Sequence, residues 1–100
     1  MDVLHDRARV GPLEVDLAGY RASLDGRPLD LTRRELETLA FLVANLDRVH
    51  SRDEIAEAIG ITKGRSVDVM LSRIRRLLGK GSIRNVRGRG WILTPGGLDA

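Results

Sequence analysis

Apolar and polar residues alternate with a period of two in the segments 13–17 and 20–24. A strand with this pattern buries one face in a core and exposes the other to water, so both segments are predicted to be β-strands. Asp25-Gly26 follows them, and these two residues tolerate the positive φ angles of a type I′ hairpin turn. Residues 27–31 are predicted to form a third short strand, with Pro28 at a sheet edge because it lacks an N–H.

Two later segments place apolar residues three or four positions apart, which is the spacing of a buried helix face. The first helix is expected to start after Thr32, whose side chain forms a capping box with that of Glu35, and to end at residues 45–47. The second is expected to start with another capping box at residues 51–54 and to stop at Gly60, a residue that favours helix C-termini.

A third helix is predicted over residues 66–78, with Ser66 as its N-cap and Asp68 in the first turn, where the helix dipole favours an acid. Residues 83–93 have the pattern of a β-hairpin. Its tip carries Arg87 and Arg89, and the glycines around them permit a tight turn.

These elements predict an α+β fold, in which an N-terminal antiparallel sheet precedes three helices and a C-terminal hairpin. Residues 1–10 show no periodicity and are expected to form a flexible lead-in. The domain is expected to span residues 11–94. The tail at residues 95–100 is expected to be flexible because a Pro-Gly-Gly sequence breaks regular structure. Between the first two helices, residues 48–50 are expected to make one sheet pairing.

Charge is distributed unevenly along the chain. Residues 1–62 hold 8 Arg and 12 Asp or Glu, a net charge of −4, whereas residues 63–91 hold 9 Lys or Arg and one acid, a net charge of +8. The whole chain of 100 residues has a net charge of +3. Such a concentration of positive charge is typical of a surface that binds a polyanion, although a solvated basic face has the same composition.

The sequence offers little for catalysis or for metal binding. It has no cysteine, and its two histidines, His5 and His50, lie far apart. His50 and Ser51 point to opposite faces of an extended backbone and make a poor base and nucleophile pair. We therefore expect no enzyme activity, no cofactor and no metal. No apolar run approaches the ~20 residues of a membrane helix, so no membrane partner is expected, and the composition suits the cytoplasm.

The second and third predicted helices form a helix-turn-helix pattern, because a short connection joins a short helix to a longer one. The third helix has one apolar face and one face that carries arginines. An α-helix fits the major groove of DNA, where arginine can bind guanine through two hydrogen bonds. The arginines of the hairpin tip can reach phosphates or a narrow minor groove. The pattern therefore indicates double-stranded DNA binding.

Three motifs resemble the OmpR/PhoB-type effector domains of response regulators. SVDVMLSRIRRLLG at residues 66–79 resembles their recognition helix, IRNVRGRGWIL at residues 83–93 their wing, and LTRRELETL at residues 31–39 the start of their first helix. The motifs occur in the family's order, and the resemblance covers residues 11–94. It implies a winged helix-turn-helix that binds promoter DNA, with two copies arranged head to tail on direct repeats.

The resemblance also implies roles for single residues. Arg65, directly before the recognition helix, would hold phosphate, and Arg73 and Arg75 would meet bases or backbone. Arg87 of the wing would enter the minor groove, with Asn85 two residues earlier. The predicted DNA-binding residues are Arg65, Ser66, Asp68, Met70, Ser72, Arg73, Arg75, Arg76, Asn85, Arg87 and Arg89.

The chain departs from the family in several places. The family's loop before the recognition helix can touch RNA polymerase, but residues 60–65 are too few for it. This argues against direct activation through that loop and leaves repression, or recruitment of RNA polymerase by another surface, open. Met70 replaces a residue that is often His, and Trp91 replaces a Tyr.

Our main interpretation is therefore sequence-specific DNA binding by a bacterial transcriptional regulator of a two-component system. The recognition helix would lie in the major groove and the wing in the minor groove. The alternative is a winged helix domain used for protein–protein interaction, through the acidic front half of the chain.

Overall fold

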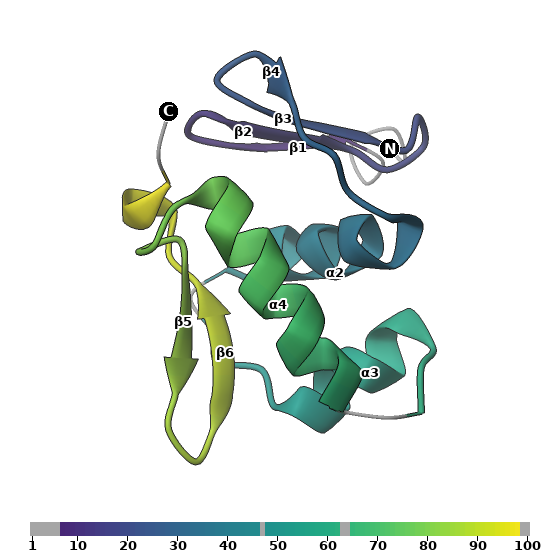
Figure 1. Cartoon of the computed structure of the whole chain (residues 1–100), viewed down its shortest axis with the longest axis vertical. Helices are drawn as coiled ribbons and strands as arrows, with labels where there is room; N and C mark the ends of the chain where they lie inside the picture. Colours follow the sequence, from purple (N-terminus) through teal and green to yellow (C-terminus); the bar gives the residue numbers. More distant parts are fainter. Residues whose placement is uncertain (1–6, 47, 63–64, 99–100) are drawn as a thin grey trace.

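The computed structural model describes residues 7–46, 48–62 and 65–98. A four-stranded sheet lies at one end of the molecule, the helices pack beneath it, and a two-stranded hairpin stands beside the last helix (Figure 1). This is the predicted α+β winged helix-turn-helix. The elements, in chain order, are β1 (Arg7–Val10), β2 (Leu13–Asp16), β3 (Arg21–Leu24), β4 (Arg27–Pro28), α2 (Arg33–Ala44), α3 (Arg52–Ile59), α4 (Arg65–Leu78), β5 (Ile83–Val86), β6 (Gly90–Leu93) and η1, a 3₁₀ turn (Pro95–Gly97).

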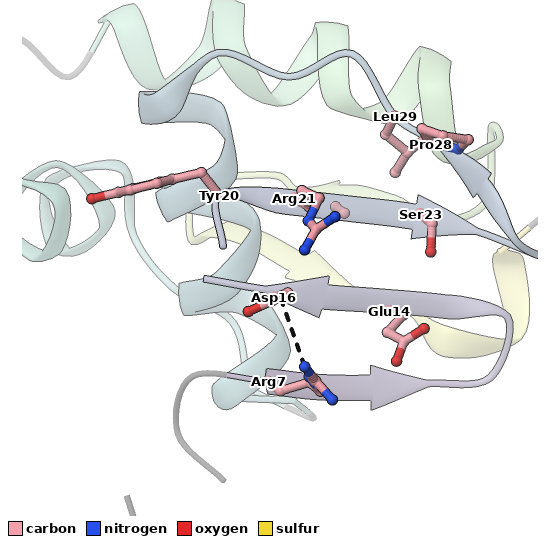
Figure 2. A pocket seen from close by; sticks show the side chains of 9 residues that line it. Arg7, Glu14, Asp16, Tyr20, Arg21, Ser23, Pro28 and Leu29 are labelled. Atoms are coloured by element: carbon pink, nitrogen blue, oxygen red, sulfur yellow. Dashed lines mark ion pairs between the residues drawn. The ribbon is translucent and has the colours of Figure 1, made fainter. Parts of the chain in front are cut away.

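The first sheet is antiparallel, in the order β1-β2-β3-β4, and has two different faces. Its inner face buries the alternate apolar residues of β2 and β3, as the period of two predicts. Its outer face is charged, and the strand register places Asp16 between Arg7 and Arg21. A shallow hollow of about 420 Å³ lies on this outer face, and the Arg7–Asp16 ion pair spans 3.9 Å beside it (Figure 2).

The hairpin turn after β3 has the predicted conformation, with φ angles of 52° at Asp25 and 82° at Gly26. The third predicted strand is shorter than expected, because β4 includes only Arg27 and Pro28. Pro28 has no N–H for the ladder. Leu29 still donates one hydrogen bond to Ala22, and the chain then leaves the sheet toward the start of α2.

Two segments that were predicted to be flexible contain regular structure. Residues 7–10 of the expected lead-in form β1, which pairs with β2 through the backbone and leaves Ala8 and Val10 half-buried. Four residues at a sheet edge are too few to give a periodic signal. In the expected tail, η1 rests against the turn at Gly81, and Leu98 packs on the core. Residues 1–6 and 99–100 lie outside the described part of the chain.

The helix starts follow their caps, with two differences. The Thr32–Glu35 capping box of α2 is complete, with hydrogen bonds of 2.9 and 3.2 Å. At the start of α3, Ser51 accepts from the Glu54 N–H, but the Glu54 carboxylate turns to other partners, so the second box is half formed. Helix α4 begins one residue earlier than expected, which places Ser66 inside the first turn rather than at the N-cap.

A buried ion pair joins α2 to α4. Glu35 is 5% exposed, and its carboxylate binds both the Thr32 N–H and the guanidinium of Arg73. Arg73 also donates to the backbone carbonyl of Asp30, at 3.1 Å. A buried carboxylate needs such partners because it has lost its water. The side chain of Arg73 therefore fixes where α4 rests on α2.

A second polar cluster surrounds His50, which is fully buried. Its Nε2 lies 3.1 Å from the carbonyl oxygen of Asn45, and its Nδ1 lies 2.9 Å from Oε2 of Glu54. Arg48 pairs with the same Glu54 oxygen at 2.6 Å. The hydrogen bond with His50, assisted by the charges of His50 and Arg48, lowers the pKa of Glu54 from its ordinary value. The expected sheet pairing at residues 48–50 is confirmed, since His50 bridges to Trp91.

Arg73→Ala is expected to lower the free energy of unfolding by about 1–2 kcal/mol. The change leaves the buried Glu35 carboxylate without its cation, and it stays below the ~3–5 kcal/mol of a fully buried pair because the Arg73 side chain is 38% exposed. Arg76→Ala, on the exposed side of the same helix, is the matched control and should change stability by less than ~0.5 kcal/mol. Urea unfolding of the three proteins measures both values, and equal losses would contradict the role given to Arg73.

Glu54→Gln is expected to destabilise the domain near neutral pH and to lose this effect in acid. The folded state holds the Glu54 proton less tightly than the unfolded chain, so the stabilisation is present above the ordinary pKa of 4.5 and disappears as the pH falls through the lowered value. Thermal unfolding of both proteins from pH 7 to pH 3 measures the difference in Tm. A difference in Tm that stays constant down to pH 3 would show that the carboxylate charge does not cause the loss of stability.

Candidate nucleic-acid interface

Helix α4 has one buried side and one open side. Val67, Leu71, Ile74 and Leu78 are fully buried. Residues three and seven positions apart share a helix face, so Val69, Ser72 and Arg76 lie together on the opposite side. All three are exposed, and Val69 has 67% of its surface in contact with solvent. The helix therefore presents a continuous strip with one apolar, one hydroxyl and one guanidinium group.

The hairpin β5–β6 stands beside α4, and its tip lies at the end of the molecule where α4 begins (Figure 1). The tip contains Arg87, Gly88 and Arg89, all exposed. Gly88 has a φ of 77°, a conformation that glycine adopts without strain. The two arginines therefore extend from a narrow loop, beyond the strands that pack against the core.

Positive charge also gathers at the other end of α4. Arg75, Arg76, Lys80 and Arg84 are exposed there. The Arg75 Nε donates to the carbonyl of Lys80 at 3.0 Å, which closes the turn after the helix. Among the described residues 72–84 there is no acid, so this end of the helix adds to the field of the hairpin tip.

Several predicted DNA-binding residues form contacts with other groups of the protein. Arg73 is held by Glu35, and Met70 is half-buried, with its sulfur 3.9 Å from Thr38 Oγ1. The side-chain amide of Asn85 donates to the Gly90 carbonyl at 3.2 Å, across the hairpin. Asp68 binds Arg52 and Trp91. The exposed predicted residues are Ser66, Ser72, Arg75, Arg76, Asn85, Arg87 and Arg89. The backbone of Arg65 opens α4, and its side chain lies outside the described structure.

Val69 is an exposed residue of this face that the sequence did not single out. Apolar residues in an amphipathic helix ordinarily belong to the core. The signal is its position: it is out of step with the stripe of Val67, Leu71 and Ile74, which takes up the buried side. Its exposed side chain lies in the centre of the polar face of α4, between the positions of Ser66 and Ser72.

In the part of the chain that the structure describes, no cluster of three or more His, Cys, Asp or Glu side chains could hold a metal ion. None of the described helices is both long and apolar enough to cross a membrane.

Comparison with known proteins gives one consistent result. The sequence model for "Transcriptional regulatory protein, C terminal" matches residues 26–93. The transcriptional regulatory protein PrrA of Mycobacterium tuberculosis is 38% identical over an alignment of 92 residues. The match covers 84% of this chain and 40% of PrrA. The chain thus spans about two fifths of the length of the curated relatives it matches.

Solved structures agree with the fold. The DNA-binding domain of Klebsiella pneumoniae RstA, crystallised in complex with the RstA box, superposes with a TM-score of 0.80 at 28% identity, over 91% of this chain and 99% of that domain. The DNA-binding domain of Escherichia coli CpxR gives a TM-score of 0.76 at 28% identity, over 87% of this chain and 94% of that one. With its helix-turn-helix, its wing and the match over residues 26–93, the chain belongs to the family of C-terminal domains of transcriptional regulatory proteins, the OmpR/PhoB-type effector domains that its motifs resemble.

Proposed function

We propose that this domain binds promoter DNA sequence-specifically, as the effector part of a bacterial transcriptional regulator in a two-component system. One observation carries the proposal: the open face of α4 combines groups that read base edges with a neighbouring cationic hairpin tip. A free helix face fits the major groove, and arginines on a narrow loop fit the minor groove. The neighbour RstA, whose DNA-binding domain was crystallised in complex with the RstA box, supports it.

In this proposal the open cations divide into two groups by position. Arg76, Lys80 and Arg84 lie along or behind the exposed face of α4, where they meet phosphates that fix the register of the protein on the duplex. Arg87 and Arg89 lie at the wing tip, where an A·T-rich minor groove has its strongest negative potential. Arg65, at the start of α4, joins the phosphate-binding group.

Base recognition falls to the strip at the centre of the helix. Ser72 supplies a hydrogen-bond donor toward base edges, and Val69 supplies an apolar group that can contact the methyl of thymine. Arg73 is left out of base reading because its guanidinium is held by Glu35 and the Asp30 carbonyl. Asp68 is left out because its carboxylate binds Arg52 and Trp91, and Met70 is left out because it is half-buried against Thr38.

The wider assignments extend this proposal. Two copies would bind direct repeats head to tail, as the family resemblance implies, and the protein would act in the cytoplasm. Helix α3 ends at Ile59 and α4 begins at Arg65, which leaves five residues between them. A contact with RNA polymerase would therefore use another surface. Catalysis has no part in the proposal.

The first test is the salt dependence of duplex binding. With four to six phosphate contacts, the slope of log K against log salt concentration should be about −4 to −5. Arg76→Ala should flatten it by about one unit. Arg21→Ala removes the same charge from the outer face of the sheet and should leave the slope unchanged. Fluorescence titrations between about 50 and 200 mM salt provide the measurement, because an affinity with such a slope falls by orders of magnitude over this range.

A salt-independent affinity for DNA would instead favour the protein–protein alternative. Equal effects of the Arg21 and Arg76 variants would show that net charge, rather than the α4 face, controls binding.

Val69→Ala should weaken binding to a duplex selected by the wild type about fivefold. The substitution removes two methyl groups, and the apolar contact that is lost with them is worth roughly 1 kcal/mol. Binding to random DNA and the Tm should stay unchanged, because the side chain is exposed. Replacing single thymines by deoxyuridine removes only the methyl group. One such replacement should weaken the wild type and leave Val69→Ala unaffected.

Identical losses in the wild type and Val69→Ala at every deoxyuridine position would exclude a contact between Val69 and a thymine methyl. The duplexes differ by one methyl group at a time, so a general change in DNA shape is controlled within the same series.

A further inference from the structure

The wing is fastened to the helix-turn-helix at Trp91, the second residue of β6. The Trp91 backbone exchanges two hydrogen bonds of 2.8 Å with His50, which comes directly before the cap of α3. The indole Nε1 donates to Oδ1 of Asp68, in the first turn of α4, at 3.1 Å. Trp91 is buried, so the junction is packed as well as hydrogen-bonded.

Asp68 completes a triangle among α3, α4 and the wing. Its Oδ2 pairs at 2.5 Å with Arg52, the first residue of α3. The carboxylate on α4 is thus bonded to the wing through one oxygen and to α3 through the other. The ion pair also neutralises an acid that would otherwise repel DNA phosphates from the start of α4.

Beyond this junction the described wing tip is not packed against the helices. A cleft of about 340 Å³ separates the tip from the start of α3, with Asn85, Gly88 and Arg89 on one side and Arg52 and Asp53 on the other. At the base, by contrast, Gly90 lies so close to the loop that a Cβ there would be 2.0 Å from the His50 carbonyl oxygen. The direction of the tip is therefore determined at its base.

We propose that Asp68 is a positioning residue, which fixes the wing relative to α4 through its hydrogen bond to Trp91. The consequence is a requirement on the DNA: the minor-groove contact of the wing must lie at one fixed spacing from the major-groove contact of α4. Each base pair advances 3.4 Å along the duplex axis, so a shift of two base pairs moves the groove out of reach of a fixed tip. This inference rests on the proposed DNA binding.

The experiment begins with selection from a random duplex pool by the wild-type protein. The selected site supplies the core sequence, the A·T-rich flank and their spacing. Two duplexes are then compared, one with the selected spacing and one with the flank shifted by two base pairs. The wild type should prefer the first about tenfold, the size of effect that one incorrect base pair causes.

Two variants test the hydrogen bond. Trp91→Phe keeps an aromatic ring but loses the indole N–H, and Asp68→Ala loses the acceptor. Each should reduce the preference for the selected spacing to about twofold. The double variant should reduce it no further, because both changes break the same Asp68–Trp91 hydrogen bond. The spacings that each variant selects from the pool should be broader than those of the wild type.

Asp53→Ala is the matched control. Asp53 is an exposed acid of the first turn of α3, so its removal changes the net charge as Asp68→Ala does, outside the Arg52–Asp68–Trp91 triangle. This variant should keep the tenfold preference. The ratio between two duplexes also separates positioning from stability, because partial unfolding lowers both affinities by the same factor. If Trp91→Phe does not fold, Asp68→Ala, at a half-buried position, decides the result.

The outcomes separate this inference from the proposed function. Salt-dependent binding with a full tenfold preference in Asp68→Ala would overturn the positioning role and leave DNA binding standing. Equal losses on both duplexes, or a wild type that binds DNA without a spacing preference, would overturn it in the same way. A wild type without affinity for any duplex would overturn the proposed function and the inference together.

Discussion

The burial of one stripe of α4 is the constraint on which the rest of this structure depends. Val67, Leu71, Ile74 and Leu78 are fully buried where α4 packs against α2 and α3. At ~1.5–3 kcal/mol for each side chain, this is roughly 6–12 kcal/mol of gross stabilisation, before the entropy of ordering is subtracted. Once this stripe is buried, the helical period fixes which residues of α4 face solvent. Val69, Ser72 and Arg76 must face solvent because rotating α4 by one residue, about 100°, would bury arginines instead.

Directional polar bonds then decide the placement that hydrophobic contact leaves undetermined. The described structure contains buried Glu35, Thr38, His50 and Ser82, and every buried side-chain nitrogen or oxygen in it has a partner. Glu35 locks α4 onto α2 through Arg73, and His50 joins the end of α2 to α3 through Glu54 and to the wing through its backbone. An apolar core tolerates sliding of its elements, but a hydrogen bond that is lost inside it costs the full desolvation of the group. These bonds therefore specify angles between elements.

Charge is separated in space as it is along the chain. The acids of the front half lie on the outer sheet face and along α2 and α3, where ion pairs such as Arg33–Glu37 keep them balanced. The last third of the chain supplies α4 and the wing, whose exposed cations have few acids nearby. Asp68, the one acid of residues 63–91, is neutralised by Arg52. The result is a domain with a mixed surface at the sheet and a cationic one at the helix and wing.

The sequence alone determined the elements and their order, because periodicity, caps and turn residues are local properties. The Thr32–Glu35 box, the Asp25-Gly26 turn and the stop at Gly60 all appear where the sequence predicts them. The sequence did not reveal β1, which forms through pairing with β2, or η1, which forms in contact with Gly81.

The sequence determined one part of the candidate interface, and the tertiary structure determined the other. The sequence identified the basic helix and hairpin, but it placed Arg73, Asp68 and Arg76 together among the predicted DNA-binding residues. Only the tertiary structure distinguished them, because Arg73 meets a carboxylate 38 residues away and Asp68 meets an indole 23 residues away, whereas Arg76 stays open to solvent. Helical periodicity gives the direction in which a side chain points. What the side chain meets there depends on segments distant in the chain, and that is decided when the core packs.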